Sequence, residues 1–600
     1  MALQTGLTTA AFADEPNHAS VAALAHHTAG RLDAAAAVYQ KIVVTEPDNA
    51  GAWHLLGVIA LQQGDLEGAH ALIEKAIALR SEVAQFHEHL GLVLAALRQP
   101  QHAVAAYTKS IALNPAVASV HGNLASSLLE LERLDAAAHH FRQALQVDPA
   151  FLPALRGLGN VLLAQGQVQQ AVVYFEQAAT LQPDSADDAY NLGNALRLMG
   201  SFEAAIDAYQ TALALHPQNV AVLNNLGSAH KSLGQLDAAA VCYLQALAID
   251  AQHARALNNL GEVRKAQLRL DEAIGYFQAA LAVSPAQAEV LSNLGDALKE
   301  VGQIDEALAC FDAALVQQPD LAFVASNRLL TRQYAHSLTA LERFAAHQDF
   351  AARFEQPLKT HWQAHGNLPQ PGRRIRLGYV SPDFRAHPVA SFLLPVLAQH
   401  DRGQFEIFCY YLHHTGDAVT SQVQALADRW CACYALADDE LAARIRADGI
   451  DVLVDLAGHT AHNRLLMLAR KPAPVQISYL GYVATTGLAA IDYRLTDRDT
   501  DPPNAQACYS ETLWRLDNPI WWCYRPPADL PDVMPLPCLK KGVVTFGSTN
   551  NFAKVSPMVL ALWAKVLRAV PDSRLVVAAV PAGSAQKRLL RDLAALGGSS

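Results

Sequence analysis

The sequence lacks any cluster of basic residues, although it contains 45 Lys and Arg residues among 600. These residues are scattered along the chain, and the formal net charge is -11. A protein that binds nucleic acid needs a positive face that neutralises phosphates. We therefore expect no nucleic-acid partner.

Cysteine is scarce and unevenly placed, with 8 residues of which the first is Cys242. Only Cys431 and Cys433 lie close together, and one C-x-C pair without a second is weak evidence for a metal site. Isolated thiols of this kind are typical of a reduced, cytoplasmic protein. There is no basic and apolar leader at the N-terminus and no apolar run of about 18 residues, so neither a signal peptide nor a membrane span is expected.

Two catalytic signatures are also missing. The sequence has no G-x-S-x-G, which a serine hydrolase of the α/β type needs, and no G-x-G-x-x-G, which dinucleotide enzymes use. The acidic stretch "DRDTD" (Asp497–Asp501) resembles a metal-binding motif, but it lies in the Pro-rich segment "TDRDTDPPN", where turn formation explains its aspartates. We predict no metal and no cofactor.

A period of 34 residues dominates the first half of the chain. The markers "NLG" recur at Gly193, Gly227, Gly261 and Gly295, and prolines at the ends of units follow the same spacing. Each unit reads as two amphipathic helices, which is typical of the tetratricopeptide repeat. We predict about nine repeats over residues 19–330 after a tail at 1–18, stacked into a superhelix with a concave inner face.

Asparagines recur in one register of these repeats. They are Asn123, Asn191, Asn225, Asn259, Asn293 and Asn327, and His89 and Gly157 interrupt the series. One interpretation is hydrogen bonding between helices. The other is a ladder of amides along the groove, which grips a peptide backbone because an amide both donates and accepts. Six occurrences in one register favour the ladder.

The texture of the sequence changes after a helical linker at 331–373. From 374 to about 540, short β-rich runs alternate with helical ones, which predicts a parallel α/β sheet. The loops that follow its strands should share one edge. Those loops carry Asp383, His387, Gly458, His459, Thr460, Leu480 and Gly481. A strand, turn, helix and strand after Lys541 predict the start of a second sheet domain over 541–600, incomplete at its C-terminal side.

Several motifs resemble a known family. The repeats with their asparagines lead into "HGN", "LGYVSPDFRAHP", "LAGHTAHNRL", "RKPAPVQISYLGYVATTG" and "NNFAKVSP". Together they are similar to the O-linked N-acetylglucosamine transferases, in particular the bacterial and SPINDLY-like relatives. The resemblance implies a GT-B fold, in which two Rossmann-like domains face a cleft. It also implies a UDP-sugar donor, no metal, and attack of a Ser or Thr hydroxyl with inversion.

The same resemblance implies roles for individual residues. Asp383 would shuttle the proton of the acceptor hydroxyl, with His387 as base or positioning group beside it. His365, in "HGN", would be a further active-site histidine, and Lys554 would contact the diphosphate across the cleft. The residues expected to bind substrate are Pro388, Leu480, Gly481, His459, Thr460 and Asn551, the last of which stands where relatives have Gln. Ala553 stands where relatives carry Tyr.

The sequence thus predicts a protein O-glycosyltransferase that transfers N-acetylglucosamine from UDP-GlcNAc to Ser or Thr. The expected partners are polypeptide acceptors in the repeat groove and a sugar nucleotide, with a homodimer as a further option and no membrane. The alternatives are a SPINDLY-like enzyme that uses GDP-fucose and a repeat scaffold with an inactive transferase region. In the family that the chain resembles, most uracil and ribose contacts lie in a C-terminal region that nothing in this sequence matches. The resemblance therefore implies weak or absent nucleotide binding.

Overall fold

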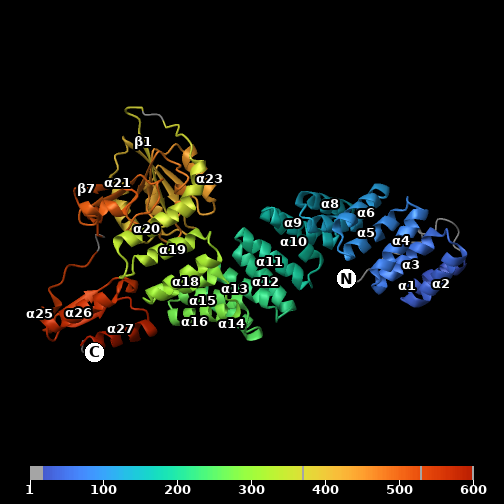
Figure 1. Ribbon diagram of the computed structural model, residues 1–600, viewed down its shortest axis with the longest axis horizontal. Helices are drawn as coiled ribbons and strands as arrows, with labels where there is room; N and C mark the ends of the chain where they lie inside the picture. The colour runs from blue at the N-terminus through green and yellow to red at the C-terminus, as the bar shows by residue number, and fades with distance from the viewer. Residues whose placement is uncertain (1–17, 368–369, 527–529, 598–600) are drawn as a thin grey trace. The chain divides into compact units, whose positions relative to one another are not determined.

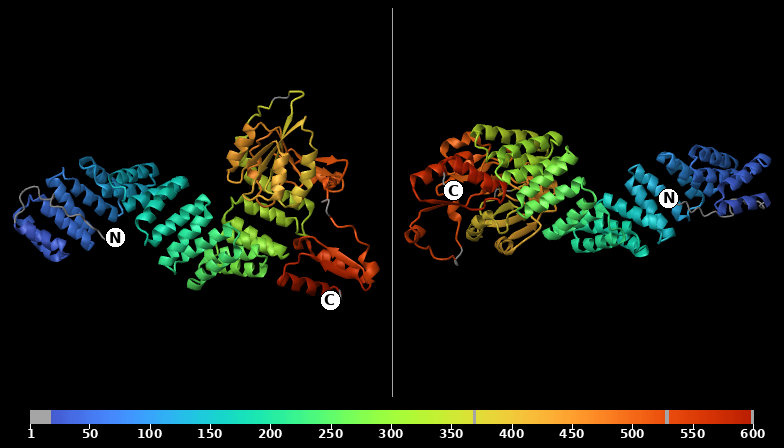
Figure 2. Two further views of the ribbon diagram at one scale, coloured as in Figure 1. Left: turned by 180° about the vertical axis from the view of Figure 1, so that it is seen from behind. Right: turned by 90° about the horizontal axis from the view of Figure 1, so that it is seen from below.

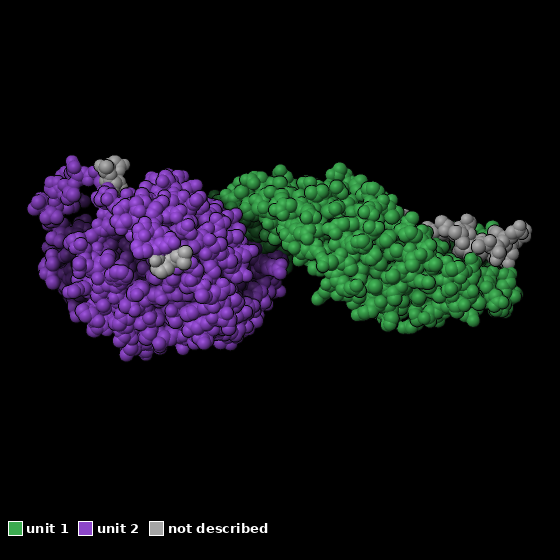
Figure 3. All heavy atoms as spheres, turned by 90° about the horizontal axis from the view of Figure 1, so that it is seen from above, with its two compact units in different colours: residues 1–251 green, residues 252–600 purple. Residues whose placement is uncertain are grey.

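The computed structural model describes residues 18–367, 370–526 and 530–597. The chain divides into two compact units, residues 1–251 and residues 252–600 (Figure 3). The first unit is wholly helical in its described part. The second contains the last repeats, the sheet and the C-terminal segment, and each unit is described on its own. The predicted tail at 1–18 lies outside the described residues except for His18, where the first helix begins.

Helices in consecutive pairs form the repeats (Figure 1). In the first unit they are α1 (His18–Thr28), α2 (Leu32–Thr45), α3 (Ala50–Gln63), α4 (Leu66–Leu79), α5 (Ala84–Ala96), α6 (Pro100–Leu113), α7 (Ala118–Glu130), α8 (Leu134–Val147), α9 (Leu152–Ala164), α10 (Val168–Leu181), α11 (Ala186–Met199), α12 (Phe202–Leu215), α13 (Val220–Ser232) and α14 (Leu236–Ile249). In the second they are α15 (Ala254–Ala266), α16 (Leu270–Val283), α17 (Ala288–Glu300) and α18 (Ile304–Gln317), followed by α19 (Ala322–Arg332) and α20 (Ala340–Phe350). Within the described residues, α1 to α18 form nine consecutive pairs.

Glycines of the repeat pattern allow the two helices of a pair to touch. A Cβ added at Gly193 would come within 2.6 Å of the ring of Tyr209, and one at Gly261 within 2.6 Å of Phe277. Both rings are fully buried. A side chain at the glycine would therefore force the paired helices apart, which explains why this position is restricted to small residues.

Histidines are buried between the first helices of the N-terminal repeats. Nε2 of His54 lies 2.9 Å from Nδ1 of His89, and both side chains are almost wholly buried. Burial lowers the pKa of His54 well below its usual value and that of His89 to about 4. Both rings are thus neutral in the folded repeats at pH 7, because a charged imidazole would lose its hydration there.

Acid should therefore loosen these repeats. A histidine with a lowered folded pKa contributes its full stability above the unfolded pKa of about 6.5 and loses it as pH falls toward the folded value. For His89 the loss between pH 6.5 and about 4 amounts to about 3 kcal/mol. Hydrogen exchange of α3 and α5, corrected for intrinsic rates, should rise over this window. His89→Asn should reduce the rise, and an unchanged pH profile in that variant would contradict the assignment.

The sheet of the second unit has seven strands, all parallel, in the order β3-β2-β1-β4-β5-β6-β7. The strands are β1 (Ile375–Ser381), β2 (Phe405–Tyr411), β3 (Arg429–Ala432), β4 (Val452–Asp455), β5 (Val475–Ser478), β6 (Tyr493–Asp497) and β7 (Thr512–Leu516). The helices between them are α21 (Pro388–Gln399), α22 (Ala418–Leu426), α23 (Asp438–Ala447) and α24 (Leu465–Leu468). The predicted parallel α/β sheet is confirmed.

The alternation of side chains along the strands divides the core of this domain into two layers. Tyr379 and Ile407 face a cluster that includes α21 and α22. Val380 and Tyr410 face the other cluster, which includes α23, α24 and residues of α19 and α20. The last helices of the repeat region therefore cover one face of the sheet directly.

The described part of the C-terminal segment forms a small parallel pair of strands with three α-helices. Its elements are α25 (Pro537–Lys541), β8 (Thr545–Ser548), a short turn of helix at Phe552–Lys554, α26 (Pro557–Ala569), β9 (Arg574–Val577) and α27 (Ser584–Ala595). The views of Figure 2 show it beside the last repeats. Phe552 and Leu589 pack there against Leu270 and Val301. Among the described residues, no helix combines the length and apolar character needed to cross a membrane.

Candidate active site

The strand order places a topological switch point between β1 and β4. The chain leaves β1 toward β2 and β3 on one side, then returns to β4 on the other side of β1. The loops after these two strands, residues 382–387 and 456–463, therefore diverge at the carboxyl edge of the sheet. In open α/β sheets this is where ligands bind. We call these two loops together the switch-point site.

Phe384 fixes the first loop. It is fully buried, and its ring lies about 6 Å from those of Tyr411 and Trp430. The backbone N–H of Ala386 donates to Oδ2 of Asp417 at 2.7 Å. These anchors hold the two neighbours of Phe384, Asp383 and Arg385, in fixed positions above the strand ends.

Asp383 and His387 meet at this site. Oδ2 of Asp383 lies 3.6 Å from Nδ1 of His387, and the backbone N–H of Val389 donates to the same Nδ1 at 3.3 Å. His387 is thus the N-cap of α21, a capping role that the sequence analysis does not assign to it. The 3.6 Å separation is too long for a direct hydrogen bond, so the carboxylate is not paired with the imidazole and remains open to a third group.

The carboxyl group of Asp383 is nearly buried, with its side chain 12% exposed. Burial raises the pKa of Asp383, and the nearby His387, Arg385, His462 and His413 oppose that rise. A carboxylate with a raised pKa is a stronger base than a solvated one. Asp383 therefore has the electrostatic setting of a group that accepts a proton.

A rim of basic residues surrounds Asp383. This rim was not predicted from the sequence. It consists of Arg385, His413, His414 and His462, which come from the loops after β1, β2 and β4. The ring of His413 stacks on His414 at 4.5 Å and meets His462 edge-on at 5.6 Å. Within the described residues, Nε of Arg385 is buried without a hydrogen-bond partner. The available signal was "HHT" directly after the strand "FEIFCYYL".

Asp455 is a second carboxyl group that sequence reasoning missed. It ends β4 and is buried, and it accepts hydrogen bonds from the backbone N–H groups of Ala457 and Gly458 at 3.2 and 2.8 Å. Burial raises the pKa of Asp455 to about 6. The residue shapes the turn of the second loop, and a carboxylate at the end of the strand "VLVD" was the signal that could have indicated it.

The loop after β5 completes the same edge. Leu480 adopts a left-handed conformation with φ of 70°, and Gly481 follows it against the backbone of β4's loop. A Cβ at Gly481 would lie 1.8 Å from the carbonyl oxygen of Leu456. Thr460 donates to the carbonyl of Ala457 at 2.8 Å and is half-buried. Of the residues predicted to bind substrate, Pro388, Thr460, Leu480 and Gly481 thus belong to the edge that holds Asp383.

The prediction that His459 binds substrate is corrected by the structure. Its side chain is fully buried, and both ring nitrogens have partners, Nδ1 with Ser326 and Nε2 with the carbonyl of Thr486. A ligand cannot reach either nitrogen without breaking these bonds. His459 is a structural residue behind the site.

The prediction that His365 belongs to the active site is also wrong. Its charged neighbours, Arg446, Lys471 and Asp492, precede β4, β5 and β6 rather than follow them. The neighbouring Asn367 donates to the carbonyls of Gly449 and Ile450 just before β4. "HGN" therefore lies at the amino edge of the sheet, whereas Asp383 lies at the carboxyl edge.

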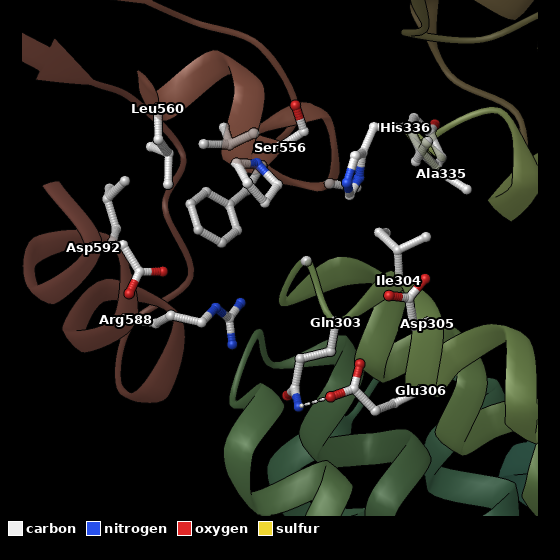
Figure 4. Close-up of a pocket in the computed structure, with 17 residues that line it drawn as sticks. Gln303, Ile304, Asp305, Glu306, Ala335, His336, Ser556, Leu560, Arg588 and Asp592 are labelled. Carbon is white, nitrogen blue, oxygen red and sulfur yellow. Dashed lines mark hydrogen bonds between the residues drawn. The ribbon is translucent and has the colours of Figure 1, made fainter. Parts of the chain in front are cut away.

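The segment that carries Lys554 lies against the repeats. Ser584 donates from its backbone N–H and its hydroxyl to Asp271, and Arg588 donates to the carbonyl of Val301. A pocket of about 250 Å³ lies at this contact, between the start of α18 and residues of α26 and α27 (Figure 4). Lys554 itself is exposed, and Asn551 caps its short helix through the N–H of Ala553.

Lys554 makes no hydrogen bond or ion pair to Asp383 in the part of the chain that the structure describes. Among the described residues, no hydrogen bond or ion pair joins the segment 541–597 to the sheet domain. The expectation that Lys554 faces Asp383 across one cleft is not supported by these contacts. Its role at the diphosphate, like that of Asn551 at the substrate, stays a prediction.

The asparagine ladder is only partly available to a ligand. All six residues are half-buried on the first helix of their repeat. Asn225 donates to Asn194 and Tyr190, and Asn293 donates to Asn258 and Glu262, so these two link neighbouring repeats. Asn259 lines a hollow of about 560 Å³ with Arg255, Glu289 and Gln318. The side chains of the remaining three, Asn123, Asn191 and Asn327, have no hydrogen bond within the described residues.

The acidic stretch at 497–501 forms a turn, as predicted. Asp497 accepts from the backbone N–H groups of Asp499 and Thr500, and Asp501 accepts from Arg494 and Thr496. Over residues 18–367, 370–526 and 530–597, no three His, Cys, Asp or Glu side chains gather in a way that could hold a metal ion. The predicted independence of metals and cofactors remains a prediction.

Comparison with known proteins gives matches over both halves of the chain. Residues 351–521 match the family described as "Glycosyl transferase family 41". Tetratricopeptide repeat profiles match residues 20–118 and 123–186, then 193–267 and 252–316. The family match thus covers the sheet domain that carries the switch-point site.

Curated relatives and one solved structure support this match. The chain is 41% identical over 279 residues to a protein named "Probable UDP-N-acetylglucosamine--peptide N-acetylglucosaminyltransferase SPINDLY" from Solanum lycopersicum. The match covers 45% of this chain and 30% of that protein. A protein with the same description named SEC, from Arabidopsis thaliana, is 32% identical over 260 residues, covering 41% of this chain and 26% of the relative. The chain thus spans less than a third of the length of these relatives.

The solved structure is a mutant of the O-GlcNAc transferase of Thermobaculum terrenum. It superposes with a TM-score of 0.59 at 34% identity, over 63% of this chain and 72% of that one. The likeness therefore extends beyond the sheet domain into the repeats, because the sheet domain alone is too small to account for it.

Proposed function

Since this chain belongs to glycosyl transferase family 41, we propose that it transfers N-acetylglucosamine from UDP-GlcNAc to Ser or Thr hydroxyls of polypeptides. The observation that carries the proposal is the pair of Asp383 and His387 at the switch-point site. Relatives named as peptide N-acetylglucosaminyltransferases support the choice of donor and acceptor. The reaction inverts the anomeric carbon and uses no metal.

Asp383 accepts the proton in this proposal. The hydroxyl oxygen of the acceptor forms the new bond to the anomeric carbon while the bond from that carbon to the diphosphate breaks. The hydroxyl proton passes to the carboxylate of Asp383, whose burial makes it more basic. The nucleoside diphosphate leaves with the electron pair of the broken bond.

His387 orients the hydroxyl. Its Nδ1 accepts the N–H of Val389, so the neutral ring carries its proton on Nε2. Because the lone pair of Nδ1 is used by Val389, the ring can contact the acceptor only by donating from Nε2 to the hydroxyl oxygen, while the hydroxyl proton passes to the carboxylate of Asp383. Positioning of this kind lowers the barrier because the reacting groups no longer need to find each other.

The repeats recruit the acceptor polypeptide through amides of the ladder. Asn123, Asn191 and Asn327 are the best placed, because within the described residues their side chains make no internal hydrogen bond. Asn259 supports the same role because it lines the hollow between α15 and α17. Backbone recognition by amides leaves the sequence of the acceptor open.

This division of the ladder predicts opposite results for two variants. Asn225→Ala should lower the free energy of unfolding by about 1 kcal/mol, because it removes bonds to Asn194 and Tyr190. Asn191→Ala should leave stability unchanged and weaken binding of an acceptor peptide about fivefold. Urea denaturation and peptide titration by fluorescence anisotropy measure the two effects. Equal loss of stability in both variants would contradict this division.

The proposed function is tested by incubating the chain with UDP-GlcNAc and a library of Ser- and Thr-containing peptides. Mass spectrometry should show peptides heavier by one N-acetylhexosamine. A gain of one deoxyhexose with GDP-fucose instead would identify a fucosyltransferase. Peptide binding without transfer from either donor would favour the scaffold interpretation.

A further inference from the structure

A buried polar joint connects the end of the repeats to the carboxyl edge of the sheet. It consists of Ser326 and His347, from α19 and α20, and of His459, Tyr482 and Thr486, from the loops after β4 and β5. The side chains of Ser326, His347 and His459 are at most 1% exposed. Apolar side chains alone would be enough to cover this face of the sheet. The presence of buried polar side chains here therefore indicates a further role.

The bonds of His459 have only one consistent direction. Its Nε2 lies 2.8 Å from the carbonyl oxygen of Thr486, which can only accept, so Nε2 carries the ring proton. Nδ1 is then an acceptor and takes the hydroxyl proton of Ser326 at 3.0 Å. The result is a continuous path from α19 through His459 to the loop after β5.

His347 makes a second path of the same kind. Its Nδ1 lies 2.6 Å from the carbonyl of Arg343 and must donate, so Nε2 accepts the hydroxyl of Tyr482 at 2.9 Å. Gln333 donates to the same hydroxyl oxygen at 3.3 Å. The rings of His347 and Tyr482 each meet that of His459 at 5.2 Å. Fully paired buried networks of this type hold their members in one arrangement.

The loops after β4 and β5 pack tightly against this joint, with no room for a larger side chain at Gly458 or Gly487. Gly458 has φ of 54°, and a Cβ there would lie 2.3 Å from Cβ of Tyr482. Gly487 has φ of 82°, and a Cβ there would lie 2.4 Å from the carbonyl oxygen of His347. A shift of α19 or α20 must therefore move the loops.

We infer that His459 and His347 are positioning residues, which let α19 and α20 set the geometry of the loops after β4 and β5. Ser326 is adjacent in sequence to Asn327, the last asparagine of the ladder. Two hydrogen bonds, from Ser326 to His459 and from His459 to Thr486, therefore connect the neighbour of Asn327 to the loop that carries Gly481. An acceptor held at Asn327 would contact the start of this connection. This inference rests on the proposed function for its catalytic meaning, whereas the mechanical link stands on the contacts alone.

The test compares Ser326→Ala with Ser292→Ala. Ser292 occupies the same register 34 residues earlier and is also buried, at 3%, so it matches Ser326 in register and burial and lacks the bond to His459. Hydrogen exchange followed by mass spectrometry should show residues 457–460 and 480–487 exchanging about tenfold faster in Ser326→Ala only. His459→Gln should give the same increase, and adding Ser326→Ala to it should change nothing further.

Enzyme kinetics provide an independent readout. With transfer present, Ser326→Ala should lower kcat about tenfold and leave the KM for the acceptor peptide unchanged, and Ser292→Ala should alter neither. If the parent chain shows no transfer, the proposed function fails, and hydrogen exchange still decides the inference. Equal exchange in both serine variants, or a uniform increase over the sheet in Ser326→Ala, would overturn it.

Discussion

Replacing Asp383 by asparagine should reduce sugar transfer by a factor of about 10² to 10⁴. The amide keeps the shape of the side chain and cannot take the proton of the acceptor hydroxyl. The neighbours that surround the group, His387 and Arg385, would remain in place. Initial rates under saturating donor and peptide measure the effect.

The matched control is Asp499→Asn. Asp499 is exposed on the same carboxyl edge, after β6, and its change removes the same charge. It should retain the parental rate, and both variants should bind the acceptor peptide like the parent. If Asp383→Asn transferred sugar at the rate of Asp499→Asn, Asp383 would not be the base. A pH profile that lost its rising limb only in Asp383→Asn would strengthen the assignment.

Replacing Gly481 by alanine should be the most damaging single change to stability in the sheet domain. The new Cβ would lie 1.8 Å from the carbonyl oxygen of Leu456 and 3.1 Å from the N of Ala457. Both obstacles are backbone, and Leu456 is fully buried, so neither can move aside. We expect a loss of about 3 kcal/mol or more in the free energy of unfolding.

A second glycine provides a control of opposite sign. Gly275 lies within α16, and a Cβ added there meets no atom within 4 Å. Gly275→Ala should raise stability by up to about 1 kcal/mol, because alanine loses less backbone entropy in a helix. Urea denaturation monitored by circular dichroism distinguishes the two variants. Equal stability of Gly481→Ala and the parent would mean that the loop after β5 can lift away from β4.

The repeats could be predicted almost completely from the sequence. Most units place a small residue and an aromatic one 16 positions apart, as in Gly193 and Tyr209, and the contact that results is local. The parallel sheet was also predictable, since strands alternate with helices along the chain. The edge shared by Asp383, Thr460 and Gly481 followed from that topology.

The remaining site residues depended on contacts far apart in sequence. Nothing near His459 indicates that Ser326, 133 residues earlier, occupies its Nδ1. His365 was assigned to the wrong edge because a motif does not show which edge of a sheet the preceding segment crosses. The hydrogen bond from Asn367 to the carbonyl of Gly449 holds this segment at the amino edge. The hydrogen bond between Ser584 and Asp271 joins residues 313 positions apart, and no repeated pattern in the sequence indicates that they meet.

The cover that α19 and α20 provide for the sheet has a consequence for how such proteins vary. Within the described residues, the sheet domain is hydrogen-bonded to α19, α20 and the residues after them but to no earlier helix, and the C-terminal segment is bonded to Asp271 and Val301. An array can therefore gain or lose units upstream of α15 without exposing apolar surface of the sheet. The length of the surface that binds an acceptor polypeptide can thus change by one 34-residue repeat at a time, while the switch-point site stays unchanged. A deletion that removes Ser326 or Phe350, in contrast, would expose the apolar face of the sheet that α19 and α20 cover, and the protein would then tend to aggregate.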